Sequence, residues 1–175
     1  MRILVLADTH VPDHARALPA AVTRAASKAE LILHAGDVTG VEVLHELAVH
    51  APVFCVEGNN DGDAIRAWGA EERLEREVGG VPFAMVHDAG PAKGRPARLR
   101  RWFPRARAIV FGHSHIPMAF RDDGTWFLNP GSPTWKRREE TPSMLSLTID
   151  RRGGISPRIV ALGPERIGGR PPRGR

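Results

Sequence analysis

The sequence predicts an α/β fold, a four-layer αββα sandwich in which two mixed β-sheets pack face to face and helices cover both outer faces. Three observations support this prediction. Short apolar runs alternate with helix-prone segments in the first part of the chain, as in parallel strands joined by helices. Later runs are separated by Gly79-Gly80 and by Asp122-Asp123-Gly124, which are typical of antiparallel hairpins. Several runs are continuously apolar, which indicates strands covered on both faces.

The first half of the chain is expected to alternate strands and helices. The Ala-rich segment 19–29 is helix-prone, with Pro19 acceptable at its first position. A second helix is expected over 41–48, where apolar residues recur at helical spacing after Thr39, a plausible N-cap. A short helix is expected around 63–68. The strands between these helices are expected at 3–7, 31–34 and 53–57.

The second half is expected to be richer in antiparallel strands. A basic helix over 96–103 should end at Pro104, because proline cannot continue a helix. The strands are expected at 73–78, 81–86, 108–111, 118–121, 125–128, 144–149 and 158–162. We therefore expect a single domain over residues 1–162. Residues 163–175, in which Gly, Pro and Arg dominate, are expected to form a disordered tail.

Length and composition argue against a disulfide-dependent, secreted or membrane-spanning protein. At 175 residues the chain is long enough to bury a core without disulfides, and its single cysteine, Cys55, lies in an apolar run and is expected to be buried. No signal peptide is recognised, and no apolar stretch approaches the ~20 residues of a membrane span. A cytoplasmic protein without membrane contact is therefore expected.

The net charge of +5 raises the question of a nucleic-acid partner. Only three of the 25 basic residues are lysines, and Ala, Gly and Pro are abundant, so a compositional bias explains the charge better. Basic residues do concentrate at 95–107, at 136–138 and from Arg166 onward. Their positive field would draw a phosphate-bearing substrate toward a nearby cleft. Nucleic acid is kept as a less favoured partner.

Five short polar clusters follow the apolar runs, at the points where strands should end. They are Asp8-Thr9-His10, Gly36-Asp37, Gly58-Asn59-Asn60-Asp61, His87 and Gly112-His113-Ser114-His115. Ligands at the carboxyl ends of neighbouring strands can converge on one crevice. Two Asp, one Asn and four His are too many donors for one four-coordinate ion, and suit two open metal sites that share a carboxylate. Oxygen and imidazole donors without a thiolate suit manganese, iron, zinc, nickel or magnesium.

The spacing within the clusters is consistent with such a site. Asp8 and His10 are two residues apart, as are His113 and His115, so on an extended chain each pair would face one side. A glycine precedes Asp37, Asn59 and His113, which allows the backbone to approach the site closely. Asp37 is a natural bridge, because its two oxygens can contact both ions.

The order of the five clusters resembles that of the calcineurin-like metallophosphoesterases, over roughly residues 1–135. The short chain and Asn129-Pro130-Gly131-Ser132 are most similar to the small bacterial and archaeal phosphodiesterases of that superfamily. The resemblance implies the metallophosphoesterase fold and two divalent ions, manganese above all. It implies a first ion held by Asp8, His10, Asp37 and His115. It implies a second ion held by Asp37, Asn59, His87 and His113.

The expected reaction is hydrolysis of a small phosphodiester by a hydroxide that bridges the two ions. Catalytic contributions are expected from His10, Asn59 and Asp61, and substrate contacts from Asn59 and Asn60. The chain departs from the family at Asn60, where larger members carry His and many small relatives carry Cys. An amide cannot act as a general acid, so this position cannot supply a proton to the leaving group. A second departure is Asp88-Ala89 after His87, where relatives often show Gly-His.

Two other functions are compatible with the expected fold. A vesicle-coat subunit with this fold binds protein partners without catalysis, but all seven candidate ligands are kept here. The second alternative is a nuclease or nucleic-acid-binding module. The sequence leaves a homo-oligomer possible. His34 is expected to be a packed strand residue, and His14 has no role in the pattern of metal ligands.

Overall fold

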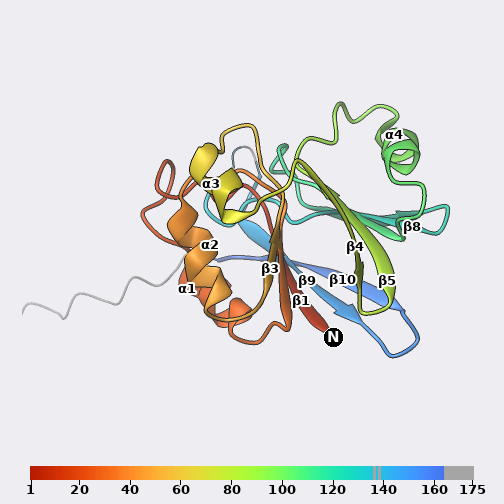
Figure 1. The fold of residues 1–175 in the computed structure, drawn as a ribbon, viewed down its shortest axis with the longest axis horizontal. Coiled ribbons are helices and arrows are strands. Elements are labelled where there is room, and N and C mark those ends of the chain that lie inside the picture. The colour runs from red at the N-terminus through yellow and green to blue at the C-terminus, as the bar shows by residue number, and fades with distance from the viewer. Residues whose placement is uncertain (136, 138, 164–175) are drawn as a thin grey trace, which may run out of the picture.

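The computed structural model describes residues 1–135, 137 and 139–163, and these form four layers (Figure 1). The first sheet has the strand order β10-β9-β1-β2-β3. Its strands are β1 (Arg2–Leu6), β2 (Leu31–His34), β3 (Val53–Cys55), β9 (Ser143–Ile149) and β10 (Ile155–Ala161). β1, β2 and β3 are parallel, and β9 runs antiparallel to both β1 and β10.

The second sheet has the strand order β4-β5-β6-β8-β7. Its strands are β4 (Arg73–Val78), β5 (Val81–Val86), β6 (Ala108–Val110), β7 (Met118–Asp122) and β8 (Thr125–Asn129). β5, β6 and β8 are parallel, whereas β4 and β7 pair antiparallel at the two edges. Both sheets are therefore mixed, as predicted.

Helices cover the outer faces of the two sheets (Figure 1). The helices are α1 (Ala20–Ala26), α2 (Val41–Ala48), α3 (Asp63–Trp68) and α4 (Arg95–Trp102). Alternate residues of β1 separate the layers: Ile3 and Val5 pack against the second sheet, whereas Leu4 and Leu6 pack with α1, α2 and α3. On the other side, Leu99 of α4 packs on Phe127 of the second sheet. The four-layer prediction is confirmed.

The helix boundaries differ slightly from those predicted. The first helix begins at Ala20, after Pro19 as its N-cap, and is shorter than the predicted 19–29. The N-cap of α2 is Gly40 rather than Thr39. The Thr39 hydroxyl instead donates to the carbonyl of Val11 at 2.9 Å, so it joins two loops at the end of the first sheet.

Three further expectations concern the cysteine, membrane-spanning helices and the C-terminal tail. Cys55 is free and buried, and burial raises the pKa of its thiol. Among the described residues, no helix is long and apolar enough to cross a bilayer. The tail prediction, apart from Gly163, concerns residues outside the described ranges.

Candidate metal centre

The polar clusters lie in loops that follow five strands, three from the first sheet and two from the second. In each sheet the strands concerned are mutually parallel, so their carboxyl ends lie at one edge. The structure brings the seven predicted donors together there: Asp8, His10, Asp37, Asn59, His87, His113 and His115.

The backbone of five of these donors lies in the left-handed region, with φ between 43° and 67°. They are Asp8, His10, Asp37, His113 and His115. The prediction that the paired donors lie on an extended chain is therefore wrong. A non-glycine residue in this region costs on the order of 1–3 kcal/mol, and such strain is concentrated at functional sites. The loops turn sharply, and this turn, rather than strand alternation, directs the side chains inward.

The predicted close approach at the glycines is confirmed. A Cβ atom on Gly58 would collide with the backbone nitrogen and the carboxylate of Asp37. Gly36 has a φ of 83°, and a Cβ there would lie 2.8 Å from the backbone nitrogen of Gly58. The loops after β2 and β3 can touch only because neither residue has a side chain.

One group of donors gathers around Asp8. Its Oδ1 lies 3.1 Å from Nε2 of His115 and 3.9 Å from Nε2 of His10. The two imidazole nitrogens face each other at 3.4 Å. All three side chains are buried, so bulk water does not screen them. The backbone N–H of His113 also donates to both oxygens of Asp8, which fixes the carboxylate.

A second group adjoins the first through Asp37. Its Oδ2 lies 3.5 Å from Nε2 of His10 and 3.3 Å from Nε2 of His87. The Oδ1 of Asn59 lies 3.1 Å from His87 Nε2 and 2.8 Å from His113 Nδ1. Ligand atoms of Asp8, Asp37 and His87 also lie within 4.8 Å of one another. Asp37 thus lies between histidines of both groups.

Two backbone carbonyls set the histidine tautomers. Nδ1 of His87 donates to the carbonyl of Ala35 and Nδ1 of His115 to that of Trp135, both at 2.7 Å. A carbonyl can only accept, so these nitrogens carry the hydrogen and each Nε2 offers a lone pair to the interior. Lone pairs of Nε2 and carboxylate oxygen at 3.1–3.3 Å repel unless a cation or proton separates them. This donor set fits divalent ions.

Burial and the carboxylates act in opposite directions on the pKa values. Burial lowers the pKa of His10, despite the attraction of Asp37 and Asp8. Burial also opposes the ionisation of Asp37, but His87 and the N–H groups of Asn60 outweigh it and hold its pKa well below the usual range. The same pairing raises the pKa of His87 against its own burial. Asp37 is therefore an anion at neutral pH.

Asp61 and Asn60 lie in positions that the sequence did not specify. The Asp61 carboxylate accepts three backbone N–H groups, from Asp37 at 3.0 Å, Thr39 at 2.8 Å and Gly58 at 2.7 Å. Asn60 donates its backbone N–H and its side-chain amide to Asp37, at 2.9 and 2.7 Å. Both residues therefore hold Asp37 in place. Asn59 and Asn60 are exposed, at the solvent-facing side of the donor cluster.

Several positioning contacts were not recognised in the sequence. The hydroxyl of Ser132 donates to the carbonyl of Asp8 at 2.7 Å, and that of Thr134 to Thr9 at 2.6 Å. Asn129 donates to the carbonyl of Gly112 at 2.9 Å. The segment after β8 thus ties together the loops after β1 and β6. The sequence of residues 129–132 indicated a family resemblance but not these contacts.

Two further histidines lie near the centre. His34 is fully buried in β2, as expected, with Nε2 3.1 Å from the Thr9 hydroxyl. His14, to which no role was given, stacks on Trp135 with ring centroids 3.7 Å apart and meets His10 edge-on at 5.3 Å. His14 and Trp135 therefore form one wall beside the buried donors.

The fold is a four-layer α/β sandwich, and the donors lie in loops that follow strands of both sheets. This combination is that of a metallohydrolase-like protein. The chain matches the calcineurin-like phosphoesterase superfamily domain over residues 1–152. A probable metallophosphoesterase of Methanothermobacter thermautotrophicus is 39% identical over 154 residues, which cover 86% of this chain and 87% of that protein. The chain belongs to the calcineurin-like phosphoesterase superfamily.

Solved structures share the fold. Zinc-complexed Vps29 of Entamoeba histolytica superposes with a TM-score of 0.73 at 23% identity, covering 92% of this chain and 99% of that one. An archaeal protein described as a novel phosphodiesterase superposes with a TM-score of 0.67 at 17% identity, covering 91% and 100%. These likenesses concern the fold.

Proposed function

We propose that this protein is a metal-dependent phosphodiesterase with a dinuclear centre. The observation that supports this most directly is the position of Asp37, whose Oδ2 lies between Nε2 of His10 and Nε2 of His87 at 3.5 and 3.3 Å. Each of those rings belongs to a different donor group. One carboxylate between two groups of donors can contact two neighbouring cations, as a dinuclear centre does.

We assign the ions as the family resemblance suggested. Asp8, His10, Asp37 and His115 would hold the first ion. Asp37, Asn59, His87 and His113 would hold the second. Asp8 is near both groups, since its ligand atoms also lie within reach of Asp37 and His87. Bound divalent ions would lower the pKa of a coordinated water and neutralise phosphate oxygens.

The chain's own residues contribute orientation and charge. The carbonyls of Ala35 and Trp135 fix the rings of His87 and His115, and Asp61 and Asn60 fix Asp37. Because Asn59 is exposed at the mouth beside these donors, its amide can donate to a phosphate oxygen while its carbonyl faces His87. Asp61 acts as a positioning residue, because it holds the backbone of Asp37. Asn60 would contact substrate only from the exposed side of the donor cluster.

The absence of an acid at position 60 determines which esters should react. Asn60 cannot supply a proton to a leaving group, and its amide is engaged with Asp37. We expect hydrolysis of bis(p-nitrophenyl) phosphate to exceed that of an alkyl phosphate monoester by at least about 100-fold, the scale of a general acid's contribution. Steady-state rates with both substrates measure this, and equal rates would show that another group donates the proton.

The proposal is tested by a hydrolysis screen on the purified chain with Mn²⁺, Zn²⁺, Fe²⁺, Ni²⁺ and Mg²⁺, using bis(p-nitrophenyl) phosphate. Asp37→Asn should lower the metal-stimulated rate at least about 100-fold, because loss of outer partners of metal ligands alone costs roughly 10- to 100-fold. The matched control is Asp63→Asn, a nearby carboxylate that is 98% exposed. Retained turnover in Asp37→Asn would contradict a shared carboxylate.

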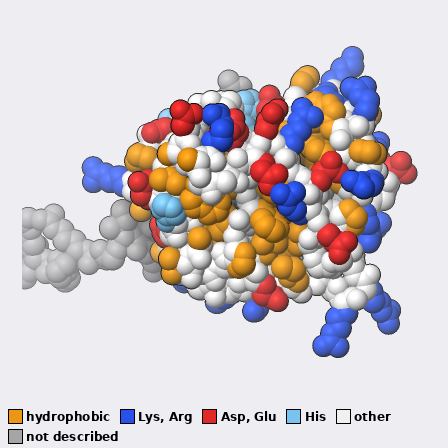
Figure 2. Space-filling model, viewed as in Figure 1, with side chains coloured by type: hydrophobic (Ala, Val, Ile, Leu, Met, Phe, Trp, Pro, Cys, Tyr) orange, Lys and Arg blue, Asp and Glu red, His pale blue; other side chains and the backbone are white. Residues whose placement is uncertain are grey.

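The same screen addresses the non-catalytic alternative. The similarity of the fold to Vps29 raises the question of whether the chain acts as a scaffold. A chain that binds metal but shows no hydrolysis with any ion or substrate would favour that function. A nucleic-acid module is less supported, because Lys and Arg side chains are interspersed with Asp and Glu over the face shown in Figure 2.

A further inference from the structure

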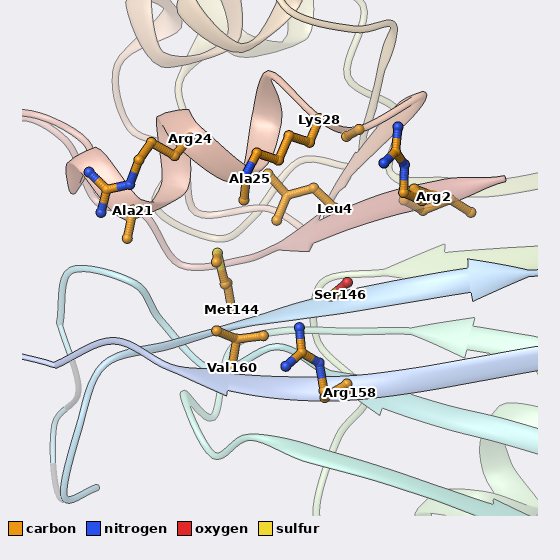
Figure 3. Close-up of a pocket in the computed structure, with 12 residues that line it drawn as sticks. Arg2, Leu4, Ala21, Arg24, Ala25, Lys28, Met144, Ser146, Arg158 and Val160 are labelled. Atoms are coloured by element: carbon orange, nitrogen blue, oxygen red, sulfur yellow. The ribbon is translucent and has the colours of Figure 1, made fainter.

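A groove lies on the outer face of the first sheet, on the side of β1 opposite to the inter-sheet core. One wall is α1, and the other is formed by β9 and β10 (Figure 3). Its volume is about 340 Å³. Leu4 of β1 lies at its floor, four residues before Asp8, so the groove and the candidate metal centre are separated by roughly 13 Å along the strand. The groove is thus distinct from the metal centre.

The floor of the groove is apolar. The buried Leu4 and Met144 lie at its base, and Ala21, Ala25 and Val160 lie beside them (Figure 3). Small alanines on α1 leave room above the sheet, and methionine is a flexible side chain that adapts to the shape of a partner. The three wall residues are only partly buried, so the apolar surface is accessible. It suits one aliphatic side chain of a partner.

The rim of the groove carries four cations from three elements: Arg2 of β1, Arg24 of α1, Lys28 after that helix, and Arg158 of β10. Arg2 has an acidic neighbour, Glu30, whose Oε2 lies 4.0 Å away. Arg24, Lys28 and Arg158 form no ion pair with any residue in the described ranges. The rim therefore has an uncompensated positive charge.

The charges are spread along the groove rather than focused on one point. Ala21, Arg24 and Ala25 lie along one face of α1 and Lys28 follows the helix, so this wall spans roughly 10 Å, at 1.5 Å per residue. That length matches about three residues of an extended peptide. Arg24 lies toward one end of the groove and Arg2 toward the other (Figure 3), so a compact phosphate would not reach both cations. The described lining contains no aromatic ring on which a nucleobase could stack.

We propose that this groove binds an acidic peptide segment of a partner protein, anchored by one aliphatic side chain on the Leu4 and Met144 floor. Carboxylates on either side of the anchor would pair with Arg24, Lys28 and Arg158. The proposal does not depend on hydrolysis at the metal centre, because the groove shares no residue with it.

The test uses amide chemical shifts of the ¹⁵N-labelled full chain during titration with the capped peptide Glu-Glu-Leu-Glu-Glu. Shifts should concentrate in β1, α1 and β10, and binding should weaken with added salt. Lys-Lys-Leu-Lys-Lys and Glu-Glu-Ser-Glu-Glu should bind at least about fivefold more weakly, because one lacks the charges and the other the anchor. Shifts around His87 and His113 instead would overturn the proposal.

Variants test the cations directly. The double variant Arg24→Glu/Arg158→Glu should weaken peptide binding at least about fivefold, since it removes two exposed pairs and adds repulsion. Both side chains are exposed, so the fold should persist, as the dispersion of the spectrum would show. Arg101→Glu on α4 is the matched control and should bind as the parent does. The peptide proposal would be refuted if the double variant bound the peptide as tightly as the parent does. It would also be refuted if phosphatidylserine vesicles or an oligonucleotide bound the same residues more tightly than the acidic peptide does.

Discussion

The Asp61 carboxylate joins two loops of the candidate metal centre through backbone hydrogen bonds. Its Oδ2 accepts the backbone N–H groups of Asp37 and Gly58, and its Oδ1 accepts that of Thr39. In Asp61→Asn, the new amide group would face at least one of these donors. We expect a loss of about 1–3 kcal/mol in unfolding free energy, and a higher Mn²⁺ concentration for half-maximal activity.

Denaturant unfolding and a metal titration of the rate measure these two effects. A purely structural role would lower stability and leave the metal titration unchanged. Asp63→Asn serves again as the control, because its carboxylate is exposed and its ion pair with the exposed Arg66 should contribute less than about 1 kcal/mol. A variant with parental stability and metal dependence would show that the three hydrogen bonds do not position Asp37.

His34 links the centre to the pH dependence of stability. Burial lowers the pKa of its ring to about 3, from 6.5. Below pH 6.5 the unfolded chain binds a proton that the folded chain does not, so stability falls as the pH drops from 6.5 toward 3, by up to about 1.4 kcal/mol per unit. His34→Leu should flatten the dependence, whereas Thr9→Val should lower stability and keep it. Urea unfolding between pH 4 and 7 tests this, and parallel curves for His34→Leu and the parent would contradict it.

At the scale of elements, the sequence predicted strands and helices well because their apolar patterns are local. The hairpin signals at Gly79-Gly80 and Asp122-Asp123-Gly124 fall between β4 and β5 and between β7 and β8. The conformation of the connecting loops was not predictable in the same way. The left-handed backbone at Asp8 and His113 depends on contacts with residues far along the chain, such as the bond from His113 N–H to Asp8.

Helix α4 offers a prediction at this scale. The helix is strongly basic, and Leu99 is its fully buried residue, packed in the outer core with Phe103 and Phe127. Leu99→Ala should cost about 2–5 kcal/mol of stability, because it leaves a cavity under the helix. His87 begins the loop that leads into α4, but its ring is held by the carbonyl of Ala35, so the rate at saturating metal should be unchanged below the melting temperature.

Chemical denaturation and a rate assay on the same preparation test this separation. Arg101→Ala, an exposed position on the same helix, should change stability by less than about 0.5 kcal/mol. A large loss of activity in folded Leu99→Ala would show that α4 positions the centre. The expected result would restrict the site to the loops between the two sheets.

At the scale of the whole molecule, the layers were predictable but the strand order was not. β9 and β10 follow the entire second sheet and return to the first, where β9 pairs with β1 and β10 pairs with β9. Apolar pattern cannot specify such a pairing, because it reports burial and not the neighbour. The convergence of the donors could be predicted, since parallel strands share an edge, whereas the contacts of Ser132 and Thr134 with the loop after β1 come from this long-range path.

The position of the centre across two sheets leads to a final prediction. Asp8, His10, Asp37 and Asn59 follow strands of the first sheet, and His87, His113 and His115 follow strands of the second. Ions that bind both sets would bind only the folded chain. At a free Mn²⁺ concentration 100-fold above Kd, one ion should stabilise the fold by about 2.7 kcal/mol, and raise the Tm by roughly 5–10 °C.

Asp37→Asn should lose most of this gain in Tm, since Asp37 faces histidines of both groups, while Asp63→Asn should keep it. Chelation with EDTA should return the parent to its metal-free Tm. Differential scanning calorimetry measures the effect without any substrate, so it separates metal binding from catalysis. A Tm that does not respond to any divalent ion would mean that the seven side chains do not join the two sheets through a metal, even though they lie together.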